Sequence, residues 1–218
     1  MRQDESRTQV YIDSLKVDCD PYFEQLRQRA DETNVPVIRR SAESFIRTIL
    51  SIKQPENILE IGCATGYSAL VMASCTKPGT QITTIEKYDK RIAEAKENFK
   101  ASPNGHRIML LEGDASDILK ELVSEGKKYD FIFMDAAKAQ YIVFLPFVME
   151  LLLPEGILLS DNVLWEGGIT ESKYALIRRD RTIHKRMREY LKTISNMKEL
   201  TTTVLDIGDG MALSKKNR

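Results

Sequence analysis

The sequence has few of the features that mark secreted, membrane-spanning or zinc-binding proteins. Among its 218 residues are only three cysteines, Cys19, Cys63 and Cys75, without the CxxC or Cys/His spacing of a disulfide framework or a zinc site. No apolar run approaches the roughly 20 residues needed to cross a bilayer, and the first residues are too polar for a secretory signal. We therefore expect a cytoplasmic protein with no membrane partner.

Histidine and net charge are also scarce. The two histidines, His106 and His184, do not lie near a serine or cysteine turn that needs a base, which disfavours nucleophilic hydrolase chemistry. The 32 basic and 32 acidic residues cancel, so the chain as a whole is not a polybasic coat for nucleic acid, although a local basic patch stays open. With 42% hydrophobic residues the composition is globular, and we expect one domain over residues 1–218.

From residue 57 onward, short apolar runs alternate with helical patterns, which is typical of a parallel sheet with crossover helices. The last run, TTTVLDIGDGMALSKK, predicts an antiparallel hairpin around the Asp209-Gly210 turn. We therefore predict a doubly wound α/β core over residues 53–218, behind a helical cap over residues 1–52. The predicted parallel strands are Asn57–Ile61, Gln81–Ile85, Arg107–Glu112, Tyr129–Met134 and Gly156–Ser160.

Helices are predicted from caps and periodicity. Asp20 and Pro21 form an N-cap and first-turn pair for a helix that runs to about Asn34. A long polar helix is predicted near Tyr174–Ser195, directly before the hairpin. Between the strands, the predicted helices include Asp89–Ala101 and Ser116–Gly126.

Open α/β sheets bind ligands outside the carboxyl ends of their strands, so the loops that follow the strands predict the site. A glycine-rich loop with Gly62 and Gly66 follows the first strand, and the second strand ends in Glu86. This combination is also the dinucleotide pattern, so NAD is an alternative. However, the loop lacks GxGxxG and carries the bulky Tyr67, and Glu60 would place a carboxylate close to a pyrophosphate. An acid there suits a ligand that carries an ammonium group.

The segment from Glu60 to Ser68 resembles the E-x-G-x-x-x-G loop of class I methyltransferases that bind S-adenosylmethionine. The resemblance implies a Rossmann-like fold with a mostly parallel seven-stranded sheet. It also implies that Ser68 lies near the methionine carboxylate, that Glu86 accepts the ribose hydroxyls, and that the residues after the third strand flank the adenine. The residues expected to bind this cofactor are Val37, Glu60, Gly62, Gly66, Tyr67, Ser68, Glu86, Asp114, Ala115 and Asp135.

Oxygen-bearing side chains follow the fourth and fifth strands. Asp135 comes directly after Met134, and Asp161 and Asn162 come directly after Ser160. Taken alone, an aspartate at a strand end is more often an N-cap than a ligand. The Asp-Asn pair at the neighbouring strand favours a metal site for Mg²⁺, with Mn²⁺ or Ca²⁺ as alternatives, whereas the lack of nearby His or Cys disfavours zinc.

Lys138 lies three residues after Asp135, where a metal and a sulfonium would disfavour its ammonium form and make it a usable base. The alternative is a solvated lysine at a helix start. The string D-A-A-K-x-x-Y resembles the metal-dependent O-methyltransferases, which include catechol and caffeoyl-CoA methyltransferases, and the match runs from about Val37 to the hairpin. This resemblance implies that Asp135 and Lys138 are catalytic: a chelated substrate hydroxyl loses its proton to Lys138 and attacks the methyl group in line.

The mechanism requires two neighbouring oxygens on the acceptor, which a catechol and 5-hydroxyuridine both supply. The run from Arg178 to Arg188 carries six Lys or Arg in eleven positions, so it could hold phosphates, or it could be a solvated helix face. The stretches VPVIRR, DAAKAQY, SDNVL and IGDGMALSKK resemble bacterial tRNA 5-hydroxyuridine methyltransferases. We therefore favour the wobble position in the tRNA anticodon region as the acceptor, with a small catechol-type molecule as the alternative.

Two further expectations follow from the resemblance. A homodimer is implied, through the amino-terminal helices. A catalytically idle cofactor- or RNA-binding protein is the remaining alternative, against which the intact Asp135, Lys138, Asp161 and Asn162 weigh. Aromatic candidates for the acceptor site could also be packing residues. The candidate acceptor-binding residues are Arg39, Tyr141, Trp165, Arg178, Arg179 and Arg181.

Overall fold

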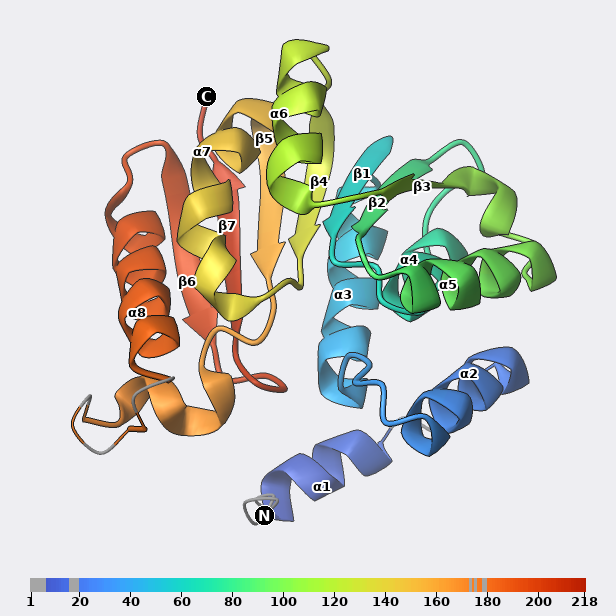
Figure 1. Ribbon diagram of the computed structural model, residues 1–218, viewed down its shortest axis with the longest axis horizontal. Helices are drawn as coiled ribbons and strands as arrows, with labels where there is room; N and C mark the ends of the chain where they lie inside the picture. The colour runs from blue at the N-terminus through green and yellow to red at the C-terminus, as the bar shows by residue number, and fades with distance from the viewer. Residues whose placement is uncertain (1–6, 16–19, 173, 175, 178–179) are drawn as a thin grey trace.

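The computed structural model describes residues 7–15, 20–172, 174, 176–177 and 180–218, and its centre is a seven-stranded sheet (Figure 1). The strand order is β3-β2-β1-β4-β5-β7-β6; the first five strands are parallel, and β7 runs antiparallel to both β5 and β6. The predicted fold class is confirmed, including the carboxyl-terminal hairpin. The strands are β1 (Asn57–Ile61), β2 (Gln81–Glu86), β3 (Ile108–Glu112), β4 (Tyr129–Met134), β5 (Leu152–Ser160), β6 (Leu200–Leu205) and β7 (Met211–Lys216).

The helices differ from the predicted ones mainly at their ends. The helix predicted from Tyr174 begins at Asp180, and Arg107 lies in a short 3₁₀ turn before β3 rather than in the strand. Asp20 caps its helix as predicted, because its carboxylate accepts a hydrogen bond from the Tyr22 N–H at 2.9 Å. The helices are α1 (Arg7–Ser14), α2 (Pro21–Glu32), α3 (Arg40–Lys53), α4 (Tyr67–Ser74), α5 (Asp89–Ala101), α6 (Ala115–Ser124), α7 (Tyr141–Leu151) and α8 (Asp180–Asn196), with 3₁₀ turns η1 (Gly105–Arg107), η2 (Lys138–Gln140) and η3 (Trp165–Thr170).

Helices cover both faces of the sheet, α3, α4 and α5 on one side and α6, α7 and α8 on the other (Figure 1). Successive strand residues point to opposite faces, so neighbours in β4 enter different cores: Phe131 packs with the α3–α4 side, and Ile132 with the α6–α8 side. Helix α2 adds Phe23 and Leu26 to the first core. Two apolar layers therefore fix the sheet and the positions of its loops.

The strand register brings the loops that carry the predicted site to one edge. Ile61 at the end of β1 pairs with Ile85 and Met134, and Met134 pairs with Ser160 at the end of β5. The loops after β1, β2, β4 and β5 therefore begin at the same level of the sheet. The segment between α2 and α3, residues 33–39, is not helical. We call its residues Pro36–Arg39 the strap.

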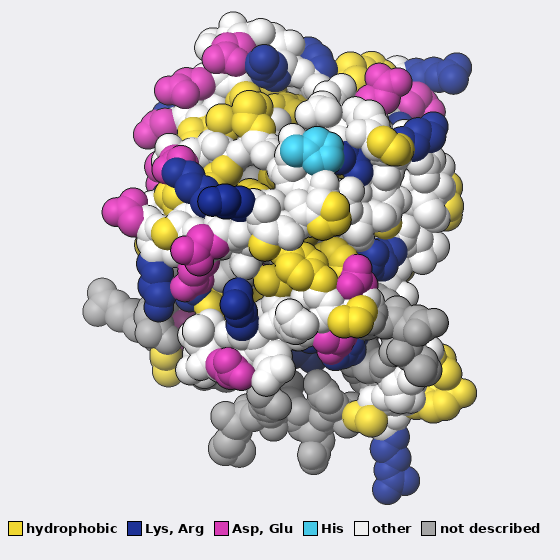
Figure 2. All heavy atoms as spheres, turned by 90° about the vertical axis from the view of Figure 1, so that its right-hand side faces the viewer, with side chains coloured by type: hydrophobic (Ala, Val, Ile, Leu, Met, Phe, Trp, Pro, Cys, Tyr) yellow, Lys and Arg dark blue, Asp and Glu magenta, His cyan; other side chains and the backbone are white. Residues whose placement is uncertain are grey.

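None of the helices within the described ranges is both long and apolar enough to cross a membrane. On the face that Figure 2 shows, basic and acidic side chains are interspersed, with small groups of hydrophobic side chains between them. That face therefore carries charges of both signs, in line with the balanced composition of 32 basic and 32 acidic residues. The cytoplasmic location stays a prediction.

Candidate active site

A cavity of about 300 Å³ lies at the carboxyl ends of the central strands, between the glycine-rich loop after β1, the end of β2 and the turn after β3. We call it the donor cavity. Two predicted cofactor residues, Glu60 and Gly66, are not among its lining residues. The others all line it: Val37, Gly62, Tyr67, Ser68, Glu86, Asp114, Ala115 and Asp135.

The two glycines of the loop are required for different reasons. At Gly62 the backbone has φ +105°, and a Cβ would overlap with the carbonyl group of Asp135, so only glycine lets the loop pass the end of β4. At Gly66 the backbone has φ +82°, and a Cβ would overlap with the Phe99 ring of α5. Gly62 therefore shapes the cavity wall, whereas Gly66 allows α4 to pack against α5.

The carboxylate of Glu86 is held by backbone N–H groups at the end of β2. Oε2 accepts from the Ala64 N–H at 2.8 Å, and Oε1 accepts from the N–H groups of Lys87 and Tyr88 at 2.8 and 3.0 Å. A carboxylate oxygen can accept more than one hydrogen bond. These bonds fix the orientation of the Glu86 carboxylate in the cavity wall. A carboxylate held in this way can accept hydrogen bonds from two neighbouring hydroxyls of a ligand.

Glu60 lies behind the wall of the donor cavity and is fully buried. Thr84 donates a hydrogen bond to its Oε2, and Oε1 has no hydrogen-bond partner within the described part of the chain. Burial raises the pKa of Glu60 to about 8, and the hydroxyls of Ser68 and Thr84 offset part of this rise. The role of Glu60 toward a ligand stays a prediction, but an unpaired buried carboxyl oxygen at this position fits a cationic ligand group.

A second, smaller cavity of about 110 Å³ adjoins the first and shares Asp135 and three strap residues with it. We call it the acid pocket. Asp161 accepts a 2.7 Å hydrogen bond from the Asn162 backbone, and the Asn162 side-chain amide donates to Asp135 at 2.9 Å. Asn162 has a left-handed backbone with φ 59°, which asparagine tolerates better than most residues. The structure therefore brings together the three predicted metal ligands.

The charges in the acid pocket repel each other. Burial and the neighbouring Asp135 charge raise the pKa of Asp161 to about 7, and burial also raises the pKa of Asp135. Lys138 acts in the opposite direction on both pKa values. No group of three His, Cys, Asp or Glu side chains in the described ranges is arranged to hold a metal, so the Asn162 amide oxygen would have to be the third donor. Two crowded carboxylates and an amide fit a hard divalent cation.

Tyr141 lines neither cavity, and its predicted contact with the acceptor stays a prediction. Its side chain is fully buried, and its hydroxyl donates between the carbonyl oxygens of Asp161 at 2.8 Å and Met134 at 3.1 Å. Its ring packs edge-on against Tyr190, with centroids 5.4 Å apart. Tyr141 therefore ties together the ends of β4 and β5, which carry the acid pocket.

The other described residues predicted to bind the acceptor do not lie together in one site. Arg39 lines the acid pocket and forms a 2.6 Å ion pair with Asp209 of the β6–β7 turn. Trp165 begins η3 and lies outside the lining of both cavities; a Cβ at Gly168 would come within 2.8 Å of its ring. Arg181 is exposed, and its Nε donates to the carbonyl of Leu176 at 3.1 Å. Arg178 and Arg179 lie outside the described residues.

Asp209 and Gln140 also line the two cavities, the first in the acid pocket and the second in the donor cavity. Asp209 raises the pKa of Asp135 and Asp161 through its charge. The Asp-Gly pair at 209–210 was a signal only for a hairpin turn, and the turn reaches the acid pocket because β7 pairs with β5. Gln140 occupies a variable position of the D-A-A-K-x-x-Y string, and nothing in the sequence indicated that it would line a cavity.

The chain was compared with known families. A family model described as "O-methyltransferase" matches residues 13–217. A caffeoyl-CoA O-methyltransferase from Citrus natsudaidai is 28% identical over 200 residues, which cover 89% of this chain and 86% of the relative. A catechol O-methyltransferase from Niastella koreensis is 31% identical over 143 residues, 64% of this chain and 65% of the relative.

Solved structures give the same fold. A candidate caffeoyl-CoA O-methyltransferase from Staphylococcus aureus superposes with a TM-score of 0.86 at 31% identity, over 96% of this chain and 99% of that one. An O-methyltransferase from Bacillus cereus in complex with S-adenosylhomocysteine superposes with a TM-score of 0.85 at 23% identity, over 96% and 97% of the two chains. At the second identity the likeness concerns the fold alone.

Proposed function

Because the chain belongs to the O-methyltransferase family and is an S-adenosylmethionine-dependent enzyme, we propose that it methylates a hydroxyl group that has a second oxygen beside it, as in a catechol or a caffeoyl-CoA-type ester. The observation that carries the proposal is the position of Asp135, which lines both the donor cavity and the acid pocket. A methyl donor in the first and an acceptor in the second would meet at one wall, as direct transfer requires.

In this proposal the side chains of Asp135, Asp161 and Asn162 hold a divalent cation, with Mg²⁺ as the first choice for an all-oxygen donor set. When bound, such an ion supplies Lewis acidity and a template for two acceptor oxygens. Lys138, as the neutral amine, takes the proton from the acceptor hydroxyl at its Nζ atom and becomes the ammonium. Gly62 and Glu86 orient the donor, and the resulting oxyanion attacks its methyl group while the sulfonium sulfur takes the bonding electron pair.

The test is transfer of labelled methyl groups from S-adenosylmethionine, with Mg²⁺ or with a chelator. Catechol, caffeoyl-CoA and tRNA from cells that lack wobble-uridine methylation are offered in parallel. Label in a catechol-type acceptor that disappears with the chelator supports the proposal. Transfer that persists with the chelator overturns the metal assignment, and an absence of label from all acceptors overturns the acceptor class.

A second candidate acceptor is 5-hydroxyuridine at the tRNA wobble position, since its O5 hydroxyl and O4 carbonyl offer the same pair of oxygens. The observation that favours it is the basic start of α8, where Arg181 and Lys185 are exposed. Arg188 is exposed as well, although it donates to the Ile169 carbonyl at 3.1 Å, as Arg181 does to the Leu176 carbonyl. Arg186 is half-buried and donates to the Ala139 carbonyl at 3.1 Å.

For the tRNA candidate, Arg181→Gln combined with Lys185→Gln should weaken tRNA binding and flatten its salt dependence, because each phosphate contact contributes to the salt slope. Lys120→Gln, on the exposed face of α6, is the matched control. An unchanged salt slope in the double variant, or label only in the small acceptors, rules out this candidate.

We further propose a homodimer that buries the apolar face of α1. Val10 and Tyr11 of α1 and Leu15 directly after it are 52%, 63% and 61% exposed, although large apolar side chains grouped on one short segment favour burial. Light scattering after size exclusion measures the mass directly. Tyr11→Ser with Leu15→Ser should shift a dimer toward the monomer, and a wild-type monomer at micromolar concentration would contradict the proposal.

A further inference from the structure

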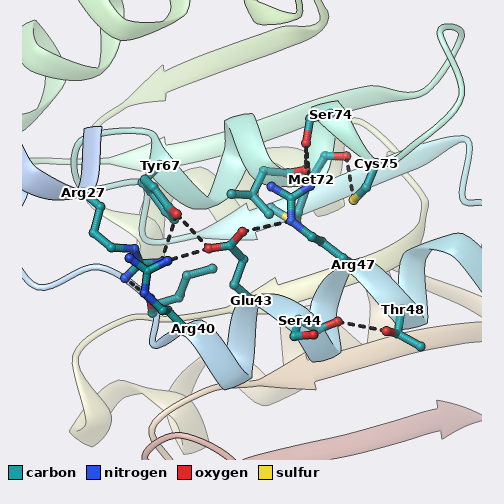
Figure 3. Close-up of polar contacts among 12 residues, drawn as sticks. Arg27, Arg40, Glu43, Ser44, Arg47, Thr48, Tyr67, Met72, Ser74 and Cys75 are labelled. Atoms are coloured by element: carbon teal, nitrogen blue, oxygen red, sulfur yellow. Dashed lines mark hydrogen bonds and ion pairs between the residues drawn. The ribbon is translucent and has the colours of Figure 1, made fainter. Parts of the chain in front are cut away.

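Arg27 of α2 fastens the strap to the helix that follows the glycine-rich loop. Its NH1 donates to the Ile38 carbonyl of the strap at 3.0 Å. Its NH2 donates to both Glu43 of α3 and the Tyr67 hydroxyl of α4, each at 2.9 Å (Figure 3). One guanidinium therefore joins its own helix, α2, to the strap, to α3 and to α4.

This cluster is buried and lies against the donor cavity. The side chains of Arg27 and Glu43 are only 12% and 2% exposed, and Tyr67 is itself a wall residue of the cavity. The Tyr67 hydroxyl donates to Glu43 at 2.7 Å, and the Arg27 guanidinium lies 4.9 Å from the centre of the Tyr67 ring. The planar fork of arginine suits several partners at fixed angles, whereas a lysine ammonium does not.

The strap lies between the two cavities. Pro36, Val37 and Ile38 line both the donor cavity and the acid pocket. The strap is held at its other end by the ion pair between Arg39 and Asp209. Displacement of the strap from α4 would therefore open the wall of the donor cavity.

We propose that Arg27 is a positioning residue for the methyl donor: it holds the strap and Tyr67 in place through Ile38 and Glu43, so that the amino-terminal helices complete the donor cavity. The inference rests on the donor occupying that cavity, as proposed above. It assigns a binding role to a residue that is absent from the cavity wall.

Arg47 provides a matched control, because it also pairs with Glu43 but does not touch the strap. Its Nε donates to Glu43 Oε1 at 2.9 Å, and its other partner is Ser74 at the end of α4 (Figure 3). It also lies over an aromatic ring, that of Phe23, at 5.2 Å. Arg47→Met and Arg27→Met thus both remove a cation from Glu43 and from a ring, but only Arg27→Met releases Ile38.

The experiment measures the affinity of S-adenosylhomocysteine by calorimetry for the full chain and its variants. Arg27→Met should weaken binding about tenfold, the usual effect of losing a charge-assisted hydrogen bond, and Arg47→Met by less than about twofold. Arg27→Lys, which keeps the charge beside Glu43, should also weaken binding several-fold, because an ammonium cannot reach Ile38, Glu43 and Tyr67 at the same time. This variant keeps the test valid if Arg27→Met does not fold.

A second readout follows the strap itself. Trypsin cleavage after Arg39 or Arg40 should be slowed by S-adenosylhomocysteine in the wild type and in Arg47→Met, but much less in Arg27→Met. Equal affinities and equal protection in the Arg27 and Arg47 variants would overturn the proposal. Wild-type protein that binds no S-adenosylhomocysteine would instead overturn the assignment of the donor cavity, and the inference with it.

Discussion

The side-chain amide nitrogen of Asn162 lies 2.9 Å from Oδ1 of Asp135, across the ends of β5 and β4. Because the nitrogen donates this bond, the amide oxygen of Asn162 remains as the acceptor atom of that side chain. Burial and the repulsion between Asp135 and Asp161 disfavour the charged forms of the two aspartates in the folded protein, and the charge of Lys138 offsets only part of this effect. The acid pocket therefore holds a fixed set of oxygen ligands, and the repulsion between its carboxylates favours the binding of a cation.

Asp161→Asn should make the metal-free protein more stable and the enzyme inactive. At pH 8 the substitution removes one of two crowded, buried charges, and we expect the free energy of unfolding to rise by about 1–3 kcal/mol. Methyl transfer should fall at least about 100-fold, because a ligand is lost. Urea unfolding with and without millimolar Mg²⁺ measures the stability. Wild type should gain stability from Mg²⁺, and an equal gain in the variant would contradict the metal assignment.

Lys138→Gln should lower kcat by about 10²–10⁴-fold, the usual contribution of a general base, with unchanged binding of S-adenosylhomocysteine. Lys138 begins η2 and is not among the lining residues of either cavity, but its charge acts on Asp135 and Asp161. Lys120→Gln on α6 is the control, since this lysine is exposed and pairs only weakly with Asp117. Initial rates at saturating donor and acceptor give kcat, and a loss confined to acceptor KM would contradict a role in proton transfer.

The sheet could be predicted from the sequence because its signal is local. Each strand is a short apolar run, and alternation such as Phe131 and Ile132 facing different cores follows from strand geometry alone. The boundaries of the helices within the amino-terminal cap, residues 1–52, were harder to predict. The strap carries apolar Val37 and Ile38 without a helix breaker other than Pro36, and its Ile38 carbonyl accepts a hydrogen bond from Arg27 of the preceding helix. Hydrophobic periodicity does not predict such side-chain contacts.

The site could be predicted where the chain carries a motif at a strand end, as at Asp135 and Asp161. Residues brought in by tertiary structure were missed. Glu43 offers the one usable signal: it is a charged residue at a buried position of α3, in line with Ile46 and Leu50. A charge within an apolar stripe indicates a buried partner. Tyr141 is the converse case: its motif predicted a contact with a ligand, whereas its described contacts are with the protein interior.

Tyr141→Phe distinguishes a packing role of this tyrosine from the predicted contact with the acceptor. Loss of its hydroxyl leaves the carbonyl oxygens of Met134 and Asp161 without that donor, so the free energy of unfolding should fall by about 1 kcal/mol. The KM for the acceptor should change little, because the side chain is fully buried. Urea unfolding and initial-rate kinetics measure the two effects. A large rise in acceptor KM with unchanged stability would instead support the predicted substrate contact.

Glu60 should make the stability of the ligand-free protein depend on pH. Its folded-state pKa is raised to about 8, whereas the unfolded carboxyl titrates near its ordinary value of about 4.3. Between these two values the folded protein holds a proton that the unfolded chain releases, so the stabilising contribution is complete below about pH 4 and is lost as the pH rises to about 8. The total loss is on the order of a few kcal/mol.

Glu60→Gln keeps the shape of the side chain and removes its titration. We therefore expect the difference in the free energy of unfolding, variant minus wild type, to increase from pH 5 to pH 8.5. Other buried carboxyls, such as Asp161, titrate in both proteins and cancel in this difference. Urea unfolding at the two pH values gives the result. A difference that stays constant would mean that Glu60 ionises as an ordinary carboxyl, and that its unpaired oxygen is solvated in the free protein.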